Sequence, residues 1–171
     1  MDTIILDGFG PFEASAWELT KDANNDFIPP LSARNSTVQK TLDGSTEDSE
    51  EPWAYFEIMK GQRNIIAFEG NDVLAFISYI PNHDVETPDG ILHGNYLSTI
   101  ITNKNTRNKG LAKRLYAELI NITEDSIITR TWSTNYAHLH ILEELGFNNC
   151  LTLPDDRGAG IDTVYYERKI I

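Results

Sequence analysis

The chain has 171 residues, of which 40% are hydrophobic and 10% aromatic, and its formal net charge at pH 7 is -12. A chain of this length can bury one core, so we predict a single domain over residues 1–171, with a variable helical and loop region over 1–60. The acidity argues against nucleic-acid binding, which requires a basic footprint over the contacting face. It favours a cationic partner, or serves solubility alone.

Membrane and metal chemistry find little support in the sequence. No segment approaches the roughly 18 to 20 apolar residues of a membrane span, and the apolar start over residues 1–6 lacks the basic region and cleavage site of a signal peptide. A single cysteine, Cys150, excludes an internal disulfide and a thiolate zinc cluster. We therefore predict a cytoplasmic protein without a metal or membrane partner, and we expect Cys150 to be a core residue of a strand.

The first half of the chain predicts helices followed by a β-hairpin. Residues 25–51 contain Pro29-Pro30 and an acidic run from Asp43 to Glu51, the composition of a long loop. Two β-rich runs flank the turn Gly70-Asn71-Asp72, which predicts a hairpin. The expected elements are helices over 13–24 and 52–59 and strands over 64–69 and 73–80.

The second half alternates strands and helices, which implies a right-handed parallel crossover. Four apolar residues at helical spacing predict the buried face of a helix: Leu111, Leu115, Leu119 and Ile122. The expected elements are strands over 91–102, 126–132, 150–153 and 163–169 and helices over 110–122 and 135–145, the last capped by Asn135 and ended by Gly146. The predicted fold class is α+β: three layers, with helices flanking a mixed, mostly antiparallel sheet that has one parallel β-α-β crossover.

The start of the helix over 110–122 carries an unusual charge pattern. A helix N-terminus has partial positive charge and normally attracts acidic side chains. Here the segment 104–114 contains five cations and no acid, the cations being Lys104, Arg107, Lys109, Lys113 and Arg114. A bound polyanion would resolve this conflict, and Gly110 and Ala112 would let the backbone approach phosphate oxygens closely.

Two motifs resemble the GNAT superfamily of acyl-CoA-dependent N-acyltransferases. Arg107, Gly110 and Ala112 match the superfamily's pyrophosphate motif, Arg or Gln followed by x-x-Gly-x-Gly or Ala, directly after a predicted strand. Asn135 and Gly146-Phe147 keep the spacing of a later motif, in which Asn is followed about eleven residues on by Gly-Phe. The resemblance covers roughly residue 64 to the C-terminus and implies a GNAT-like fold.

The resemblance also implies a site for acetyl-CoA as co-substrate. In this family the fourth strand, here residues 100–102, binds the pantetheine arm like an added strand, and the following loop binds the diphosphate. The cofactor-binding residues implied are Ile100, Ile101, Thr102, Arg107, Asn108, Lys109, Gly110, Leu111, Ala112, Asn135 and His138. The implied reaction is acetyl transfer to a primary amine by direct attack within a ternary complex. Homodimers are common among similar folds, so a homodimer is a further possibility.

The sequence departs from the family at the proton donor. Many members carry a tyrosine four residues before the Gly of Gly-Phe, and this position is Leu142. His138 lies one turn earlier on the same helical face, so it is our candidate proton donor, beside the alternative that it only packs or hydrogen-bonds near the cofactor. The thiolate can also leave unaided, since a thiol pKa of about 8.5 makes it a tolerable leaving group.

Tyr96 is the candidate general base, beside His93, Glu57 and Glu69, although such residues are more often structural and a water relay can replace them.

Trp132 and Tyr79 are candidates for the acceptor pocket, with the core as the alternative. We expect a small-molecule or peptide amine, and from the acidity a cationic one; drug, polyamine, amino acid and protein N-terminus stay open. The main alternative function is a catalytically degenerate acyl-CoA-binding sensor or structural protein.

Two further alternatives rank lower. A nucleotide phosphotransferase would be expected to carry a Gly-x-x-x-x-Gly-Lys-Ser/Thr loop and a pair of metal-binding carboxylates, neither of which is evident. A pure interaction module would account for the acidic run but not for the basic loop over 107–112.

Overall fold

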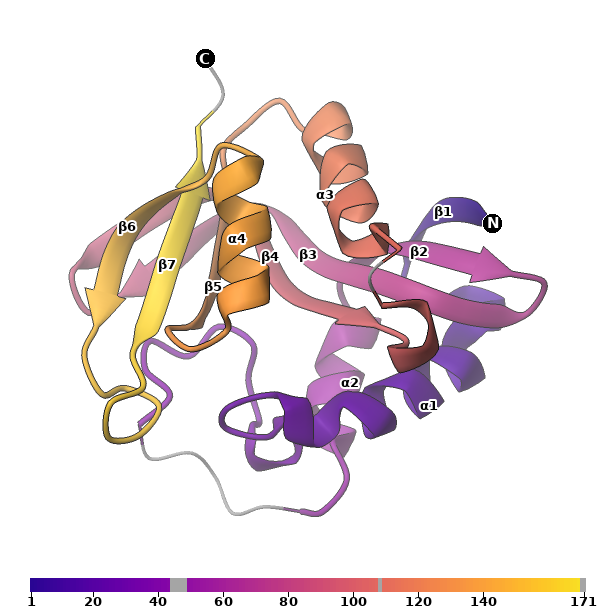
Figure 1. The fold of residues 1–171 in the computed structure, drawn as a ribbon, viewed down its shortest axis with the longest axis horizontal. Coiled ribbons are helices and arrows are strands. Elements are labelled where there is room, and N and C mark those ends of the chain that lie inside the picture. The colour runs from indigo at the N-terminus through magenta and orange to yellow at the C-terminus, as the bar shows by residue number, and fades with distance from the viewer. Residues whose placement is uncertain (44–48, 108, 170–171) are drawn as a thin grey trace.

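A computed structural model describes residues 1–43, 49–107 and 109–169. After the first strand, its strands and α-helices follow the predicted order along the chain (Figure 1). The strands are β1 (Asp2–Asp7), β2 (Arg63–Glu69), β3 (Asp72–Thr87), β4 (Gly90–Thr102), β5 (Ile127–Trp132), β6 (Asn148–Leu153) and β7 (Thr163–Arg168). The α-helices are α1 (Glu13–Ala23), α2 (Trp53–Lys60), α3 (Leu111–Ile122) and α4 (Tyr136–Glu144).

The described strands form one seven-stranded sheet in the order β1-β2-β3-β4-β5-β7-β6. Among them β4 and β5 are the parallel pair, joined through α3, and the other pairs are antiparallel. The predicted fold class, a mostly antiparallel mixed sheet with one parallel crossover, is therefore confirmed.

Helices cover both faces of the sheet and bury a core on each (Figure 1). On one face, α3 and α4 pack Leu115, Leu119 and Leu142 against alternate residues of β2 and β3 such as Ile65 and Ile77. On the other, α1 and α2 pack a second cluster against the intervening residues of the same strands. Both faces of the central strands are buried here, and the sequence is accordingly a continuous apolar run over residues 65–68 of β2 and 73–77 of β3.

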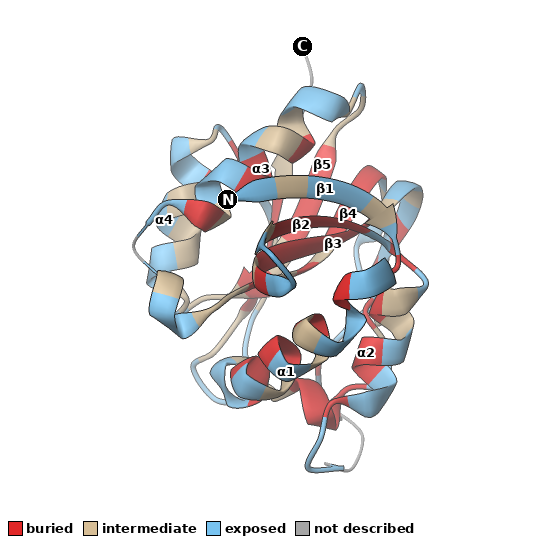
Figure 2. Cartoon of the chain, turned by 90° about the vertical axis from the view of Figure 1, so that its right-hand side faces the viewer, coloured by how far each residue is buried: buried red, intermediate tan, exposed pale blue. Residues whose placement is uncertain are grey.

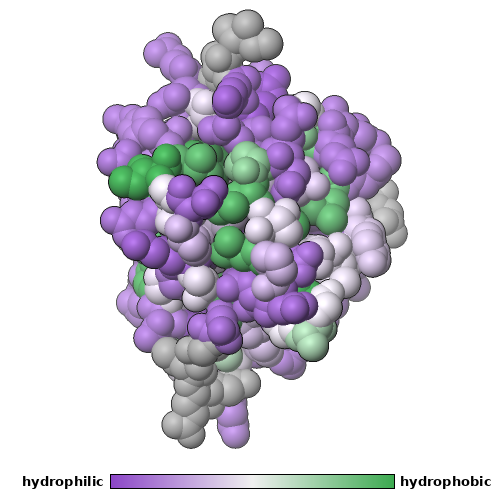
Figure 3. All heavy atoms as spheres, turned by 90° about the vertical axis from the view of Figure 1, so that its left-hand side faces the viewer, coloured by the Kyte–Doolittle hydropathy of each residue, from purple (hydrophilic) through white to green (hydrophobic). Residues whose placement is uncertain are grey.

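A third apolar cluster lies where the long β3–β4 hairpin meets β5 and β7. Val85, Tyr96, Ile128 and Tyr165 are buried there, and partly buried residues pack around them: Ile80, Leu92, Leu151 and Leu153. Figure 3 views the β6–β7 side of the molecule and shows hydrophobic side chains gathered in the middle of a mainly hydrophilic face. The core therefore reaches the surface on this side.

A β-bulge changes the faces that β4 presents. Ser78 pairs with Thr99 and Tyr79 pairs with Leu97, so Ser98 has no partner on β3. The extra residue lets Thr99 bond Tyr55 of α2 while Leu97 packs in the α3–α4 cluster. The pairing of β4 with β5 ends at Leu97 and Thr129, although both strands continue. The sheet therefore splits between β4 and β5.

Some predicted boundaries were wrong. We predicted no strand over residues 2–7, but β1 pairs along its whole length with β2. It is an edge strand with no buried residue (Figure 2), so it lacks the apolar alternation by which a strand is recognised. The β3–β4 hairpin extends to Thr87 and Gly90, beyond the predicted ends. Ile122 is 47% exposed rather than buried, whereas Tyr116 is fully buried in its helix.

Within the described residues, no helix combines the length and the apolar character needed to cross a membrane.

Candidate active site

The split between β4 and β5 opens into a cavity of about 880 Å³. Its walls come from both strands, the start of α3, one side of α4, and segments on the α1–α2 face. Nine residues predicted to bind the cofactor line it: Ile100, Ile101, Thr102, Arg107, Gly110, Leu111, Ala112, Asn135 and His138. Lys109 does not line it, and Asn108 lies outside the described residues.

One edge of β4 faces this cavity without a strand partner. Ile100, Ile101 and Thr102 pair with β3 on one side, but among the described residues no strand pairs with them on the other. Backbone N–H and C=O groups in a strand point alternately to the two sides, so every second residue offers a donor and an acceptor to the cavity. An extended ligand arm carrying amide groups can complete this edge.

The start of α3 continues the cavity and suits an anion. Gly110 precedes the helix with a φ of 73°, the left-handed region that glycine adopts most readily. A side chain at Gly110 would meet no atom within 4 Å, so the position requires glycine for its φ and not for lack of protein space. The first turn contains no acidic residue and has no side-chain capping bond, and the first N–H groups of a helix have no partner within the helix, so they can bind phosphate oxygens.

The basic cluster is less isolated than the sequence implied. Carboxylates from α4, from α3 and from the segment after α1 approach the cations. The ion pairs are Arg107 and Lys104 with Asp26, Lys113 with Glu144 and Arg114 with Glu118, at N–O distances of 3.0, 3.8, 2.7 and 3.7 Å. Exposed pairs of this kind contribute only about 0–1 kcal/mol, so a polyanion can displace the carboxylates.

Asn135 occupies the N-cap position of α4, as predicted, but its side chain does not cap the helix. Its Nδ2 donates to Thr131 Oγ1 at 3.0 Å, and its side chain makes no capping hydrogen bond. The same Nδ2 lies 3.5 Å from His138 Nδ1, and His138 Nε2 lies 2.6 Å from the hydroxyl of Tyr116 on α3. The side chain of Asn135 therefore links β5 to α4 at the cavity wall, and His138 extends this link to α3.

His138 is neutral at physiological pH. Burial lowers the pKa of its imidazole from 6.5 to about 4, so imidazolium is scarce near neutrality. A general acid must carry the proton it donates, which disfavours His138 as the donor to the thiolate. Its contacts fit the alternative that it hydrogen-bonds beside the cavity.

This pKa predicts a pH-dependent stability. The folded state binds the His138 proton more weakly than the unfolded state, so its contribution is complete above pH 6.5 and declines as the pH falls toward 4. When the pH is lowered from about 7.5 to about 5.2, the unfolding free energy of the wild type should fall by about 1.5 kcal/mol more than that of His138→Gln. This figure includes a discount for solvent screening, because the His138 side chain is only partly buried. Urea unfolding measures this, and the matched control is His140→Gln, an exposed position on the same helix. Equal pH slopes for wild type and His138→Gln would contradict the assignment.

Tyr96 lines the cavity in an unreactive state. Its ring is 1% exposed, and its hydroxyl donates to the backbone oxygen of Thr37 at 3.0 Å. Burial raises the pKa of this phenol, which disfavours the tyrosinate that a general base requires. Leu142, at the position of the family's tyrosine, is fully buried in the α3–α4 core and does not line the cavity. Neither position brings a free proton-transfer group to the cavity.

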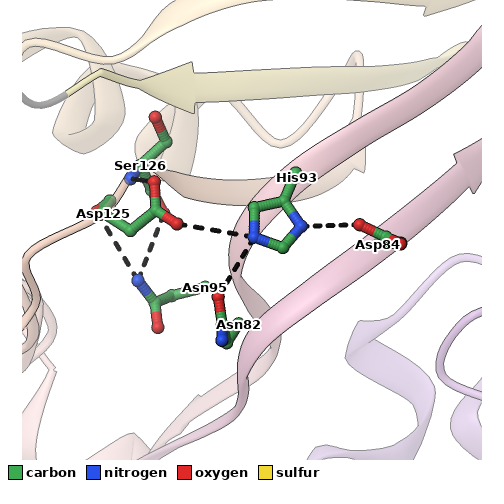
Figure 4. Close-up of polar contacts among 6 residues, drawn as sticks. All are labelled: Asn82, Asp84, His93, Asn95, Asp125 and Ser126. Atoms are coloured by element: carbon green, nitrogen blue, oxygen red, sulfur yellow. Dashed lines mark hydrogen bonds and ion pairs between the residues drawn. The ribbon is translucent and has the colours of Figure 1, made fainter.

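The other candidate bases lie away from the cavity. Figure 4 shows the ring of His93 between Asp84 on one side and Asn82 and Asp125 on the other, all near the surface. Glu57 and Glu69 are exposed, and neither lines the cavity.

Of the two aromatic candidates for the acceptor pocket, Trp132 lines the cavity whereas Tyr79 is buried in the core.

Cys150 lies in β6 as predicted but is exposed, so the expectation of a core cysteine was wrong. The described residues contain no group of three or more His, Cys, Asp or Glu placed to hold a metal ion.

The sequence analysis missed three cavity arginines: Arg34, Arg130 and Arg157. They come from the loop before α2, from β5 and from the β6–β7 loop. Only Arg130 carried a local signal, because it interrupts a strand whose other residues are apolar or β-branched. The other two lie in loops, where an arginine is ordinarily solvated.

A sequence model of the Acetyltransferase (GNAT) family matches residues 31–147. This span is most of the chain and contains the free edge of β4, the start of α3 and all of α4. The chain therefore belongs to the GNAT acetyltransferase family. Comparison with curated protein sequences finds no match.

Solved structures share the fold over the whole chain. An aminoglycoside 6'-acetyltransferase type Ii superposes with a TM-score of 0.72 at 16% identity, covering 100% of this chain and 98% of that one. An aminoglycoside 6'-N-acetyltransferase complexed with coenzyme A gives 0.69 at 14% identity, with the same coverage. A ribosomal-protein-alanine N-acetyltransferase from Brucella melitensis gives 0.62 at 18% identity, covering 98% and 99%. At such low identities the likeness establishes the fold alone.

Proposed function

We propose that the protein is an N-acetyltransferase that moves an acetyl group from acetyl-CoA to a primary amine. The observation that carries this proposal is the free edge of β4, which runs along the cavity toward the start of α3. The pantetheine arm would bind this edge, and the diphosphate would bind the N–H groups after Gly110 beside Arg107. Family membership supports the same reaction.

The reaction requires mainly positioning. The neutral amine attacks the thioester carbonyl, the C–N bond forms, and the C–S bond breaks with its electron pair leaving on sulfur. The amine gives up its proton to water, and the thiolate is stable enough to leave because a thiol pKa is about 8.5. N–H groups on the free edge of β4 are available to the carbonyl oxygen as negative charge develops on it. No covalent intermediate on the protein is involved.

A second candidate is an acyl-CoA-binding protein without turnover. It is favoured by the missing proton donor: Leu142 is buried in the core, and His138 is neutral at physiological pH. The two candidates make the same prediction for binding and differ only in thiol release.

Release of free CoA thiol from acetyl-CoA, followed across a panel of amines, tests the proposal. Acceptor-dependent thiol release with matching acetylated product is the expected result. Binding of acetyl-CoA without release for any amine would favour the second candidate, and absence of binding would reject both.

A further inference from the structure

Three arginines converge on the wall of the cavity on the side of α1 and α2. Arg34 is 8% exposed and Arg157 is 9% exposed, while Arg130 of β5 is half-buried. Segments far apart in the sequence bring them together, and each lines the same cavity as the free edge of β4. Arginines are seldom buried to this degree without a partner of opposite charge.

None of the three makes an ion pair with a described residue. Their hydrogen bonds go mainly to neutral oxygens: Arg34 Nε and Nη2 donate to Pro29 O, Arg157 Nη1 to Ile28 O, and Arg130 Nη1 to Gln39 O. Arg157 Nε donates to Thr163 Oγ1, and Arg130 also bonds Tyr165 and the Gln39 side chain. Positive charge therefore collects at this wall, and no carboxylate within the described part of the chain pairs directly with it.

The neighbouring carboxylates are engaged elsewhere. Asp26 and Glu144 line the cavity but pair with Arg107 and Lys113 at the α3 end. Asp156, the residue before Arg157, accepts hydrogen bonds from Leu42 N and Thr163 Oγ1, and its charge raises the pKa of Arg157 by less than burial and the neighbouring arginines lower it. Among the described residues that line the cavity, the acidic ones, Asp26 and Glu144, thus lie where cations already pair with them.

The guanidinium planes are held by aromatic rings. Arg34 lies over Phe27 and Tyr55 at 5.6 and 5.9 Å from the ring centres, and Arg157 lies over Trp132 at 5.6 Å. A guanidinium stacked on a ring keeps its edge free to donate in its own plane. Burial, and then the charges of Arg34 and Arg130, lower the pKa of Arg157 from 12.5 to about 9. An anion bound between these groups would offset the repulsion among the three charges and raise this pKa again.

A purely structural role explains only part of this arrangement. The bonds to the carbonyls of Ile28, Pro29 and Gln39 fasten the segment over 28–39 to the sheet. Neutral amide or hydroxyl donors could make such bonds without bringing three like charges together, two of them buried. The positive charge of these side chains is therefore not explained by their bonds to the backbone, and a bound anion would explain it.

We propose that the acceptor amine carries a carboxylate, which Arg34, Arg130 and Arg157 bind while its amine faces the thioester. The inference rests on the proposed acetyl transfer and names its substrate class. The guanidinium fork matches a carboxylate in two parallel hydrogen bonds. Because the same cavity also holds the co-substrate arm, the acceptor is a small amino-carboxylate such as an amino acid. This class replaces the cationic acceptor that the net charge suggested.

Matched acceptor pairs test the inference with the wild-type protein. Each amino acid is compared with its own primary amide at saturating acetyl-CoA, so that only the carboxylate differs. The amide has the lower amine pKa and hence more neutral amine, so simple reactivity favours the amide. We expect kcat/KM to be at least about 10-fold higher for the acid, which corresponds to one good charge-assisted contact.

Variants then assign the preference to the arginines. Arg157→Gln should reduce the acid-to-amide ratio of kcat/KM about 10-fold, with the Kd of acetyl-CoA unchanged, and Arg157→Lys should restore part of it. A merely structural arginine would lower both substrates together. Arg34→Gln is the second variant, and Arg63→Gln is the control, since Arg63 is exposed and pairs with Asp7 outside the cavity.

The failures of the two proposals are distinguishable. Preference for amides, polyamines or aminophosphonates over amino acids would overturn the carboxylate inference and leave acetyl transfer intact. Acetyl-CoA binding without turnover of any amine would overturn acetyl transfer. In that case calorimetry of amino acids and their amides against CoA-saturated protein decides the inference, and equal or absent binding would overturn it.

Discussion

Arg107→Glu should weaken acetyl-CoA binding on the order of 100-fold, because a charge-assisted contact to phosphate becomes a repulsion. Arg107 lines the cavity at the loop before α3, and among the described residues its guanidinium pairs with the exposed Asp26 alone, at 3.0 Å. Calorimetric titration with acetyl-CoA measures the change. The matched control is Lys40→Glu, which alters the net charge equally at an exposed site outside the cavity and should leave Kd unchanged.

Asp26→Asn gives a prediction of opposite sign for the same site. Asp26 competes with phosphate for Arg107 and Lys104, so removing its charge should tighten acetyl-CoA binding a few-fold. Equal acetyl-CoA binding by the wild type and Arg107→Glu would contradict the proposal that the diphosphate binds at this loop. Weaker binding by Asp26→Asn would show that the ion pair organises the site and does not compete with the ligand.

Gly94→Ala should destabilise the protein by about 3 kcal/mol, because it forces apart the strands that define the cavity. A Cβ atom at Gly94 would lie 2.5 Å from the backbone oxygen of Ser126, closer than such contacts allow. The same oxygen accepts a hydrogen bond from Asn95 N at 2.8 Å, so it cannot withdraw without losing that bond. Urea unfolding measures the loss.

Gly61→Ala is the matched control for this steric effect. Gly61 follows α2 with a negative φ, and the nearest atom to an added Cβ is Ile58 O at 3.4 Å. A change within about 0.5 kcal/mol is expected there. If Gly94→Ala unfolded at the same urea concentration as the wild type, the result would contradict the close contact between β4 and the backbone of Ser126.

Local signals in the sequence determined the core of this fold. The turn Gly70-Asn71-Asp72 and the apolar spacing of Leu111, Leu115 and Leu119 each lie within one or two elements, and the structure has the predicted hairpin and helix there. The loop over 107–112 could be recognised for the same reason: its glycine and cations are adjacent in the chain. Such features depend on neighbours a few residues away, which a sequence displays directly.

Contacts between distant segments were decided only by the tertiary structure. The edge strand β1 has no buried face of its own and exists through its pairing with β2. Asp26 and Arg107 are 81 residues apart in the sequence but form a hydrogen bond in the structure. The loop therefore has no acidic residue near it in the sequence, yet it has one near it in space. Arg34 and Arg157 likewise form one charged wall only after folding. The net charge of the chain describes its surface as a whole, whereas the charge that a ligand meets depends on which few side chains the fold turns into the cavity.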